Sequence, residues 1–94
     1  MTFTFHPIAQ QELFQAIEFY EHQVPGLGVV FFNEIVQAVD LIKLYPEAYP
    51  LITNRTHKCS LRKFPYIILY GIIDEAIVVS AIAHQHQHPR SYLR

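Results

Sequence analysis

The segment from residue 64 to residue 83 is the most apolar part of the chain and constrains the fold most. Asp74 and Glu75 stand at its centre, where charge would be most costly inside a lipid bilayer, so we expect no membrane span. Residues 66–73 are apolar almost throughout, which is typical of a central strand covered on both faces. Residues 76–83 are apolar and rich in β-branched side chains. We therefore predict two buried strands joined by a tight hairpin.

The first half of the chain has the patterns of one strand and two helices. Residues 2–6 alternate between polar and apolar side chains, and an apolar stripe at helical spacing predicts a helix over residues 8–22. Proline and glycine in residues 24–28 break this helix. A second helix is predicted from about residue 27 to residue 45, where Pro46 ends it. Because the turn is so short, the two helices must be antiparallel neighbours.

The order strand, helix, helix and then strands predicts an α+β fold. A further strand is expected over residues 58–64, with Cys59 on one face and Lys58 and Arg62 away from the helices or at the sheet edge. We expect an antiparallel helical hairpin packed on one face of a three- to four-stranded, mainly antiparallel sheet. The expected core residues between hairpin and sheet are Leu13, Ile17, Phe32, Ile35, Val39, Ile68 and Val79.

Composition limits the class of protein. Residues 1–94 are 51% hydrophobic, which is enough for a single domain with its own core. The only cysteine, Cys59, excludes an internal disulfide framework and a C-x-x-C zinc ribbon, and favours a reducing compartment. It is interpreted as a small buried hydrophobe. The first residues lack the basic and apolar regions of a signal peptide, so we expect a cytoplasmic protein.

Charge is distributed unevenly along the chain. Residues 1–50 hold six acidic residues and one cation, Lys43, for a net charge of −5. Residues 51–94 hold six cations and two acidic residues, for a net charge of +4, so that the sum is −1. This asymmetry predicts two faces with different partners. The total of −1 argues against a general binder of polyanions.

Residues 62–70, Arg-Lys-Phe-Pro-Tyr-Ile-Ile-Leu-Tyr, resemble the Arg-x-Phe-Pro-Tyr-x-(apolar)-x-Tyr segment of the RelE/ParE toxins. These are the toxin halves of bacterial type II toxin–antitoxin modules, often called plasmid stabilisation proteins. Residues 77–84 resemble the last strand of that family, which ends in Ala-x-x-His, and Pro89 stands five residues after His84. The resemblance covers essentially the whole chain, and it implies the α+β arrangement described above.

The resemblance implies the toxin component of such a module, neutralised by a cognate antitoxin and using no cofactor. Its target would be DNA gyrase, inhibited by binding as in ParE-like toxins, or mRNA on the ribosome, cleaved as by RelE-like endoribonucleases. The family tail usually has Arg, Tyr and Trp where this chain has Gln87, Ser91 and Tyr92. The missing Arg and the negative net charge favour the ParE-like interpretation. A nuclease, a non-toxic binding module and a homo-oligomer stay open as alternatives.

Two overlapping sets of site residues follow. In a nuclease, Arg62 would stabilise the scissile phosphate, His84 or His86 would transfer protons, and Tyr92 would position the substrate. The expected antitoxin- or target-binding residues are Lys58, Arg62, Lys63, Arg90 and Arg94. His84, His86 and His88 alternate, so an extended tail would place them on one side. This spacing is not a closed zinc pattern, and we expect no metal.

Overall fold

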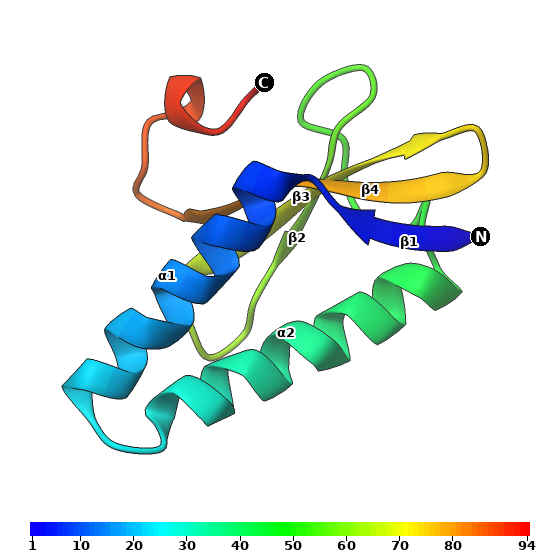
Figure 1. Ribbon diagram of the computed structural model, residues 1–94. Coiled ribbons are helices and arrows are strands. Elements are labelled where there is room, and N and C mark those ends of the chain that lie inside the picture. Colours follow the sequence, from blue (N-terminus) through cyan, green and yellow to red (C-terminus); the bar gives the residue numbers. More distant parts are fainter.

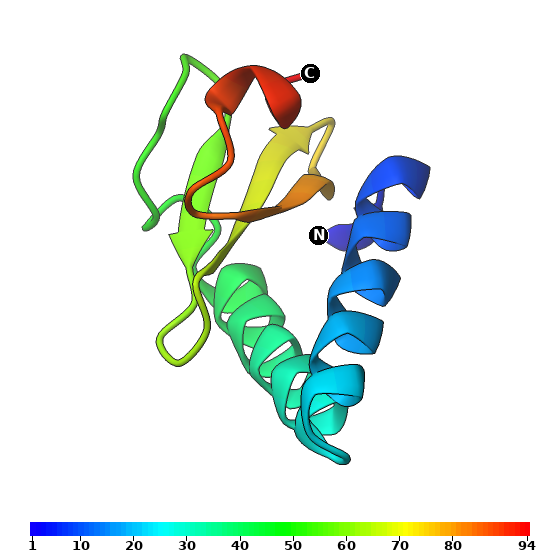
Figure 2. The same cartoon turned by 90° about the vertical axis from the view of Figure 1, so that its left-hand side faces the viewer.

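Two helices and four strands make up the fold in the computed structural model, which describes residues 1–94. In chain order the elements are β1 (Thr2–Phe5), α1 (Pro7–Gln23), α2 (Leu27–Leu44), β2 (His57–Ser60), β3 (Tyr66–Ile73), β4 (Ala76–His84) and a short 3₁₀ helix, η1 (Pro89–Ser91). The helices form a hairpin over the sheet, and the tail after β4 folds back so that its last residue, Arg94, reaches Glu12 of α1 (Figures 1 and 2). The predicted α+β architecture is confirmed.

The sheet is mixed, because its first strand joins its last. The strand order is β1-β4-β3-β2, in which β2, β3 and β4 are antiparallel neighbours. β1 runs parallel to β4, from the pair Thr2–Ala76 to the pair Phe5–Val79. The hairpin between β3 and β4 turns at Asp74 and Glu75, as predicted. Both have positive φ values, 50° and 63°, as in the tight turns whose twist matches that of the strands.

Side chains and a glycine fix the helical hairpin. The ring nitrogen Nδ1 of His6 accepts the amide of Ile8, 3.1 Å away, and so caps α1. At the other end of α1, the carboxylate of Glu21 accepts the amides of Gly26 and Gly28. A Cβ atom on Gly28 would lie 2.8 Å from the carbonyl oxygen of Ile17, so only glycine allows this helix contact. Neither helix has the length and apolarity needed to cross a membrane.

The core between hairpin and sheet is close to the predicted one, with one exchange. Leu13, Ile35, Ile68 and Val79 are buried as expected, and Ile17 and Val39 pack against them partly exposed. Phe32 was expected inside but is 42% exposed, whereas Phe31 is fully buried. Phe31 shares a helix face with Gly28, Ile35 and Ile42, and adjacent residues of a helix point in different directions. The prediction for Phe32 was therefore wrong by one position.

A bulge in β4 changes which of its residues face the helices. Tyr70 pairs with Val79 and Leu69 pairs with Ala81, so Ser80 is an extra residue. Before Ser80, Ile77 and Val79 face the helices; after it, Ala81 and Ala83 face the opposite side of the sheet. A second, smaller core forms on that side from the residues Ile67, Leu69, Ala81, Ala83 and Tyr92.

Strand β2 is shorter than predicted, and this correction shapes the candidate site. The alternating pattern predicted a strand over residues 58–64, but pairing with β3 ends at Ser60. Beyond Ser60 the amides of Arg62 and Lys63 turn towards α2 and donate to Glu34, each over 2.8 Å. Before β2, Leu51 forms one isolated antiparallel bridge to His57.

Candidate functional site

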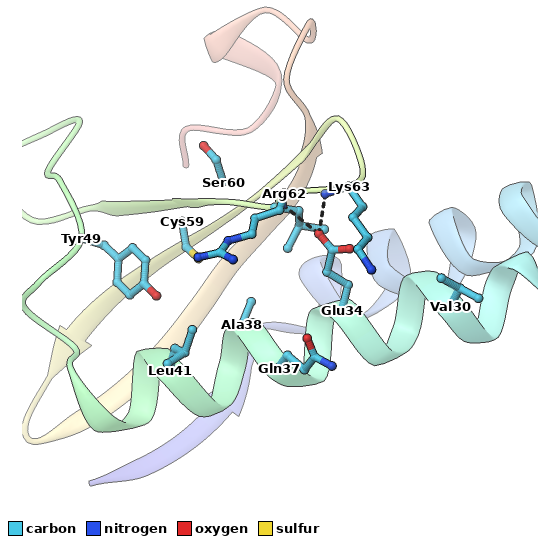
Figure 3. A pocket seen from close by; sticks show the side chains of 11 residues that line it. Val30, Glu34, Gln37, Ala38, Leu41, Tyr49, Cys59, Ser60, Arg62 and Lys63 are labelled. Carbon is cyan, nitrogen blue, oxygen red and sulfur yellow. Dashed lines mark hydrogen bonds between the residues drawn. The ribbon is translucent and has the colours of Figure 1, made fainter.

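A groove of about 520 Å³ separates the middle of α2 from the edge strand β2 and the loop that follows it. Its α2 side carries the apolar residues Val30, Ala38 and Leu41 and the polar residues Glu34 and Gln37. Its sheet side carries Tyr49, Cys59, Arg62 and Lys63, among others (Figure 3). Apolar and cationic groups therefore face each other across one concave surface.

The guanidinium of Arg62 carries a positive charge that no ion pair within the protein neutralises. Its side chain runs along the groove towards Cys59 and Tyr49 (Figure 3). The guanidinium takes part in no hydrogen bond or ion pair of the protein, and the only ion pair joins Arg94 to Glu12. Arg62 was expected on the sheet face away from the helices or at the sheet edge; it lies in the loop after the edge strand β2, and its side chain extends over the helix side.

Two ionisable groups line the groove beside Arg62, and both stay protonated at neutral pH. Burial raises the pKa of the Cys59 thiol, and a hydrogen bond with Tyr49 offsets part of that rise. Burial, and then the neighbouring Cys59, raise the pKa of the Tyr49 phenol, while Arg62 acts in the opposite direction. The thiol is therefore a weak nucleophile, in agreement with its interpretation as a buried hydrophobe.

The C-terminal tail is folded, so its histidines do not alternate along an extended segment. The side-chain oxygen of Gln87 accepts the amide of His84 at 2.8 Å, and Nδ1 of His84 accepts the amide of His86 at 3.1 Å. Gln87 also donates to the hydroxyl of Ser91, which donates to the carbonyl oxygen of His88. These bonds turn the chain back on itself. No group of three His, Cys, Asp or Glu side chains is placed to hold a metal ion.

Side chains at the end of the tail contact the sheet and α1. Tyr92 is 9% exposed and packs on the far face of the sheet with Ala81 and Ala83. Arg94 forms an ion pair with Glu12, with Nη2 2.9 Å from Oε2, and donates to the carbonyl oxygen of Ser80. Tyr92 and Arg94 therefore support the fold in this structure.

The structure brings the predicted site residues together in two separate pairs, because His84 and His86 have ring centroids 5.2 Å apart in the tail, away from the groove. Arg62 and Lys63 share the groove, whereas Lys58, one residue before the buried Cys59, points to the opposite face of the sheet. His84, His86, Arg90 and the rest of the tail do not line the groove. Sequence reasoning missed Glu34, because nothing in a single sequence indicates that its partners are amides 28 and 29 positions away.

Comparison with known proteins gives the family. Residues 3–89 match the family described as the ParE toxin of the type II toxin–antitoxin system, parDE. The chain belongs to this family. It is therefore the toxin of a type II toxin–antitoxin system and has an antitoxin as its partner, which confirms the resemblance drawn from the sequence.

Two relatives of this ParE-family toxin illustrate the range of similarity. Toxin ParE2 of Mycobacterium tuberculosis, in the strains CDC 1551 and H37Rv, is 29% identical over 87 residues, which cover 92% of this chain and 83% of the relative. A chain of the chromosomal ParDE system from P. aeruginosa superposes with a TM-score of 0.79 over 89% of this chain and 95% of that chain. At 15% sequence identity, this superposition shows a common fold.

Proposed function

We propose that this toxin acts by binding, with DNA gyrase as its target, and that it carries out no chemistry of its own. The observation that carries the proposal is the groove beside α2, where an unpaired guanidinium lies among apolar side chains. Such a surface suits a protein segment with acidic and apolar side chains. Because gyrase acts on chromosomal and plasmid DNA, the proposal also implies a cytoplasmic protein.

The groove lacks what a ribonuclease would need beside Arg62. General acid–base catalysis requires a group that titrates near the working pH and lies within reach of the reacting proton. The thiol of Cys59 and the phenol of Tyr49 have raised pKa values. The predicted proton carrier His84 uses Nδ1 to accept a backbone amide of the tail. These features favour binding over cleavage of mRNA.

The target can be tested with two assays on the purified wild-type protein. We expect inhibition of supercoiling by purified gyrase, and no cleavage of mRNA on translating ribosomes. A gyrase with full supercoiling activity at saturating toxin would contradict the target. Robust, ribosome-dependent cleavage would replace the proposal with the nuclease alternative, and would direct attention to Arg62 and His84.

We also propose that the groove receives a segment of the antitoxin. The helices of the toxin carry most of its acidic residues, whereas Arg62 and Lys63 give the groove a positive side. An acidic antitoxin segment would complement this side, and apolar side chains beside its carboxylates would contact Val30 and Leu41. Lys58, Arg90 and Arg94 stay predicted binding residues.

Charge-reversal substitutions distinguish antitoxin binding at the groove from binding at the other face of β2. Arg62→Glu should weaken the complex with the co-expressed antitoxin and reduce its dependence on salt, as measured by calorimetry at low and high ionic strength. Lys58→Glu makes the same charge change on the opposite face of the same sheet edge, and so tests whether that face also belongs to the interface. An unchanged affinity for Arg62→Glu would remove the groove from the interface, whereas equal losses in both variants would extend the interface to both faces.

A further inference from the structure

Glu34 connects α2 to the loop that carries the groove's two cations. One carboxylate oxygen, Oε1, accepts the backbone amides of Arg62 and Lys63, each over 2.8 Å. Dashed lines mark both bonds in Figure 3. Hydrogen bonds to a carboxylate are about twice as strong as those between neutral groups. Two of them on consecutive amides fix the loop relative to the helix.

The same loop is fixed again two residues later. The ring of Phe64 contacts the rings of Tyr20 and Phe31, with centroids 4.8 Å and 5.1 Å away. The amide of Leu61 donates to the carbonyl oxygen of Tyr66 at 3.0 Å. Between these two points Glu34 is the only group that holds the backbone of Arg62 and Lys63. Without Glu34, only contacts at the two ends of this part of the loop would fix its position.

The charge of Glu34 is directed at amides and not at the neighbouring guanidinium. An ion pair between Glu34 and Arg62 would occupy the cation of the groove, but the structure contains no such pair. The carboxylate therefore holds the backbone that carries Arg62 while the guanidinium stays free for an external anion. Arg62 is thus fixed through its backbone, while its side chain stays unpaired.

We infer that Glu34 is a positioning residue, which holds Arg62 ready for a carboxylate of the docked antitoxin segment. The inference rests on the antitoxin docking proposed above and adds the residue that prepares the site. A cation on a fixed backbone loses less conformational freedom on binding than one on a mobile loop. Glu34 therefore raises affinity for an acidic segment although it is itself negatively charged.

If Glu34 positions Arg62, removing Glu34 should change the affinity for the antitoxin in the opposite direction to that expected from charge repulsion alone. If Glu34 only repelled an acidic partner, Glu34→Ala would tighten the complex. If Glu34 positions Arg62, the same substitution should weaken the complex by about tenfold, the scale of losing a charge-assisted hydrogen bond. Glu34→Gln keeps a side-chain oxygen at the same place, so it should restore most of the affinity lost in Glu34→Ala.

The experiment measures the affinity of the full-length toxin for its co-expressed and separately purified antitoxin by calorimetry. Glu18→Ala is the matched control, because Glu18 is an exposed acidic residue of α1 and its removal makes the same change of net charge. A double-mutant cycle with Arg62→Ala tests the connection. In the Arg62→Ala background, Glu34→Ala should change the affinity by less than about twofold, because the cation it positions is gone. Amide chemical shifts of Arg62 and Lys63 report whether their two hydrogen bonds to residue 34 are lost in each variant.

Three results would overturn the inference. They are tighter binding by Glu34→Ala, an equal loss from Glu34→Ala with and without Arg62, and a weakened complex in which the amide shifts of residues 62 and 63 do not move. A loss of binding that parallels a fall in melting temperature, with no rescue by Glu34→Gln, would assign Glu34 to the fold alone. The gyrase assay is independent of these measurements, so failure of the proposed target leaves them unaffected.

Discussion

Oε2 of Glu12 lies 2.9 Å from Nη2 of Arg94, although 82 positions separate the two residues. The other carboxylate oxygen of Glu12 accepts the amide of Ile82, and Arg94 also donates to the carbonyl oxygen of Ser80. β1 pairs with β4 only as far as Val79, which leaves the later part of the β4 edge without a strand partner. The two side chains therefore satisfy backbone groups of an open sheet edge.

We expect Glu12→Ala to destabilise the protein more than Arg94→Ala. Loss of Arg94 removes a partly exposed ion pair, worth about 1 kcal/mol or less. Loss of Glu12 also leaves the amide of Ile82 without an acceptor, at a cost of about 1–3 kcal/mol. Urea denaturation measures both, and Arg90→Ala is the control because Arg90 is exposed and makes no side-chain hydrogen bond. Equal losses in the first two variants would contradict the edge-capping role.

The two adjacent phenylalanines of α2 should respond very differently to truncation. Phe31→Ala should cost about 3–5 kcal/mol of unfolding free energy, because its ring is fully buried among Tyr20, Phe64 and Tyr66. Phe32→Ala should cost about 1 kcal/mol or less, because the ring is 42% exposed. Thermal or chemical denaturation of the two variants measures the difference. A larger loss for Phe32 would mean that the helix is rotated relative to the sheet.

Alkaline pH should unfold the protein partly through Tyr70. Burial raises the pKa of this phenol to about 12, and its hydroxyl donates to the carbonyl oxygen of Pro46. Because the folded pKa exceeds the unfolded value of about 10, the stabilisation is complete below pH 10 and is lost as pH rises from about 10 to 12.

Tyr70→Phe should therefore show a shallower loss of stability over this alkaline range than the wild-type protein. Burial also raises the pKa values of Tyr20, Tyr49 and Tyr66, so part of the pH dependence should persist. Urea titrations at several alkaline pH values provide the slopes, with Tyr45→Phe, at an exposed tyrosine, as the control. Identical slopes in wild type and Tyr70→Phe would refute the assignment.

The turn between β3 and β4 offers a stabilising substitution. Glu75 has a φ of 63°, in the left-handed region that is costly for a residue with a Cβ atom and free of that cost for glycine. Glu75→Gly should stabilise the protein by about 0.5–1 kcal/mol, while Glu47→Gly, outside the helices and strands, should not. The comparison requires only melting temperatures. A less stable Glu75→Gly variant would show that the charged side chain of Glu75 contributes more to stability than its backbone conformation costs.

The regular elements could be predicted because their signals are local. The apolar run at residues 66–73 became β3 with the expected ends, and the stripe at residues 8–22 became α1 to within one residue. Prediction failed where a choice depended on distant partners. Which of Phe31 and Phe32 is buried depends on where α2 rests on the sheet.

The groove could be anticipated only in part. Arg62 and Lys63 were predicted binding residues within a strand over residues 58–64, and both line the groove, from the loop after a shorter strand. The early end of β2 could not be predicted, because it depends on Glu34 in a helix that the sequence places far away. The fold of the tail could not be predicted for a similar reason, because it depends on hydrogen bonds of Gln87 to the amide of His84 and to the hydroxyl of Ser91.

The parallel pairing of β1 with β4 determines when, during synthesis, this toxin can fold. Residues 2–5 are made more than 70 residues before their partners, residues 76–79. A nascent chain that stops before β4 lacks both the neighbour of its first strand and the side chains of Ile77 and Val79 that fill the core. Contacts between such distant segments form late in folding. The fold is therefore completed only after β4 has been made, and a chain truncated before β4 leaves both helices without the sheet they cover.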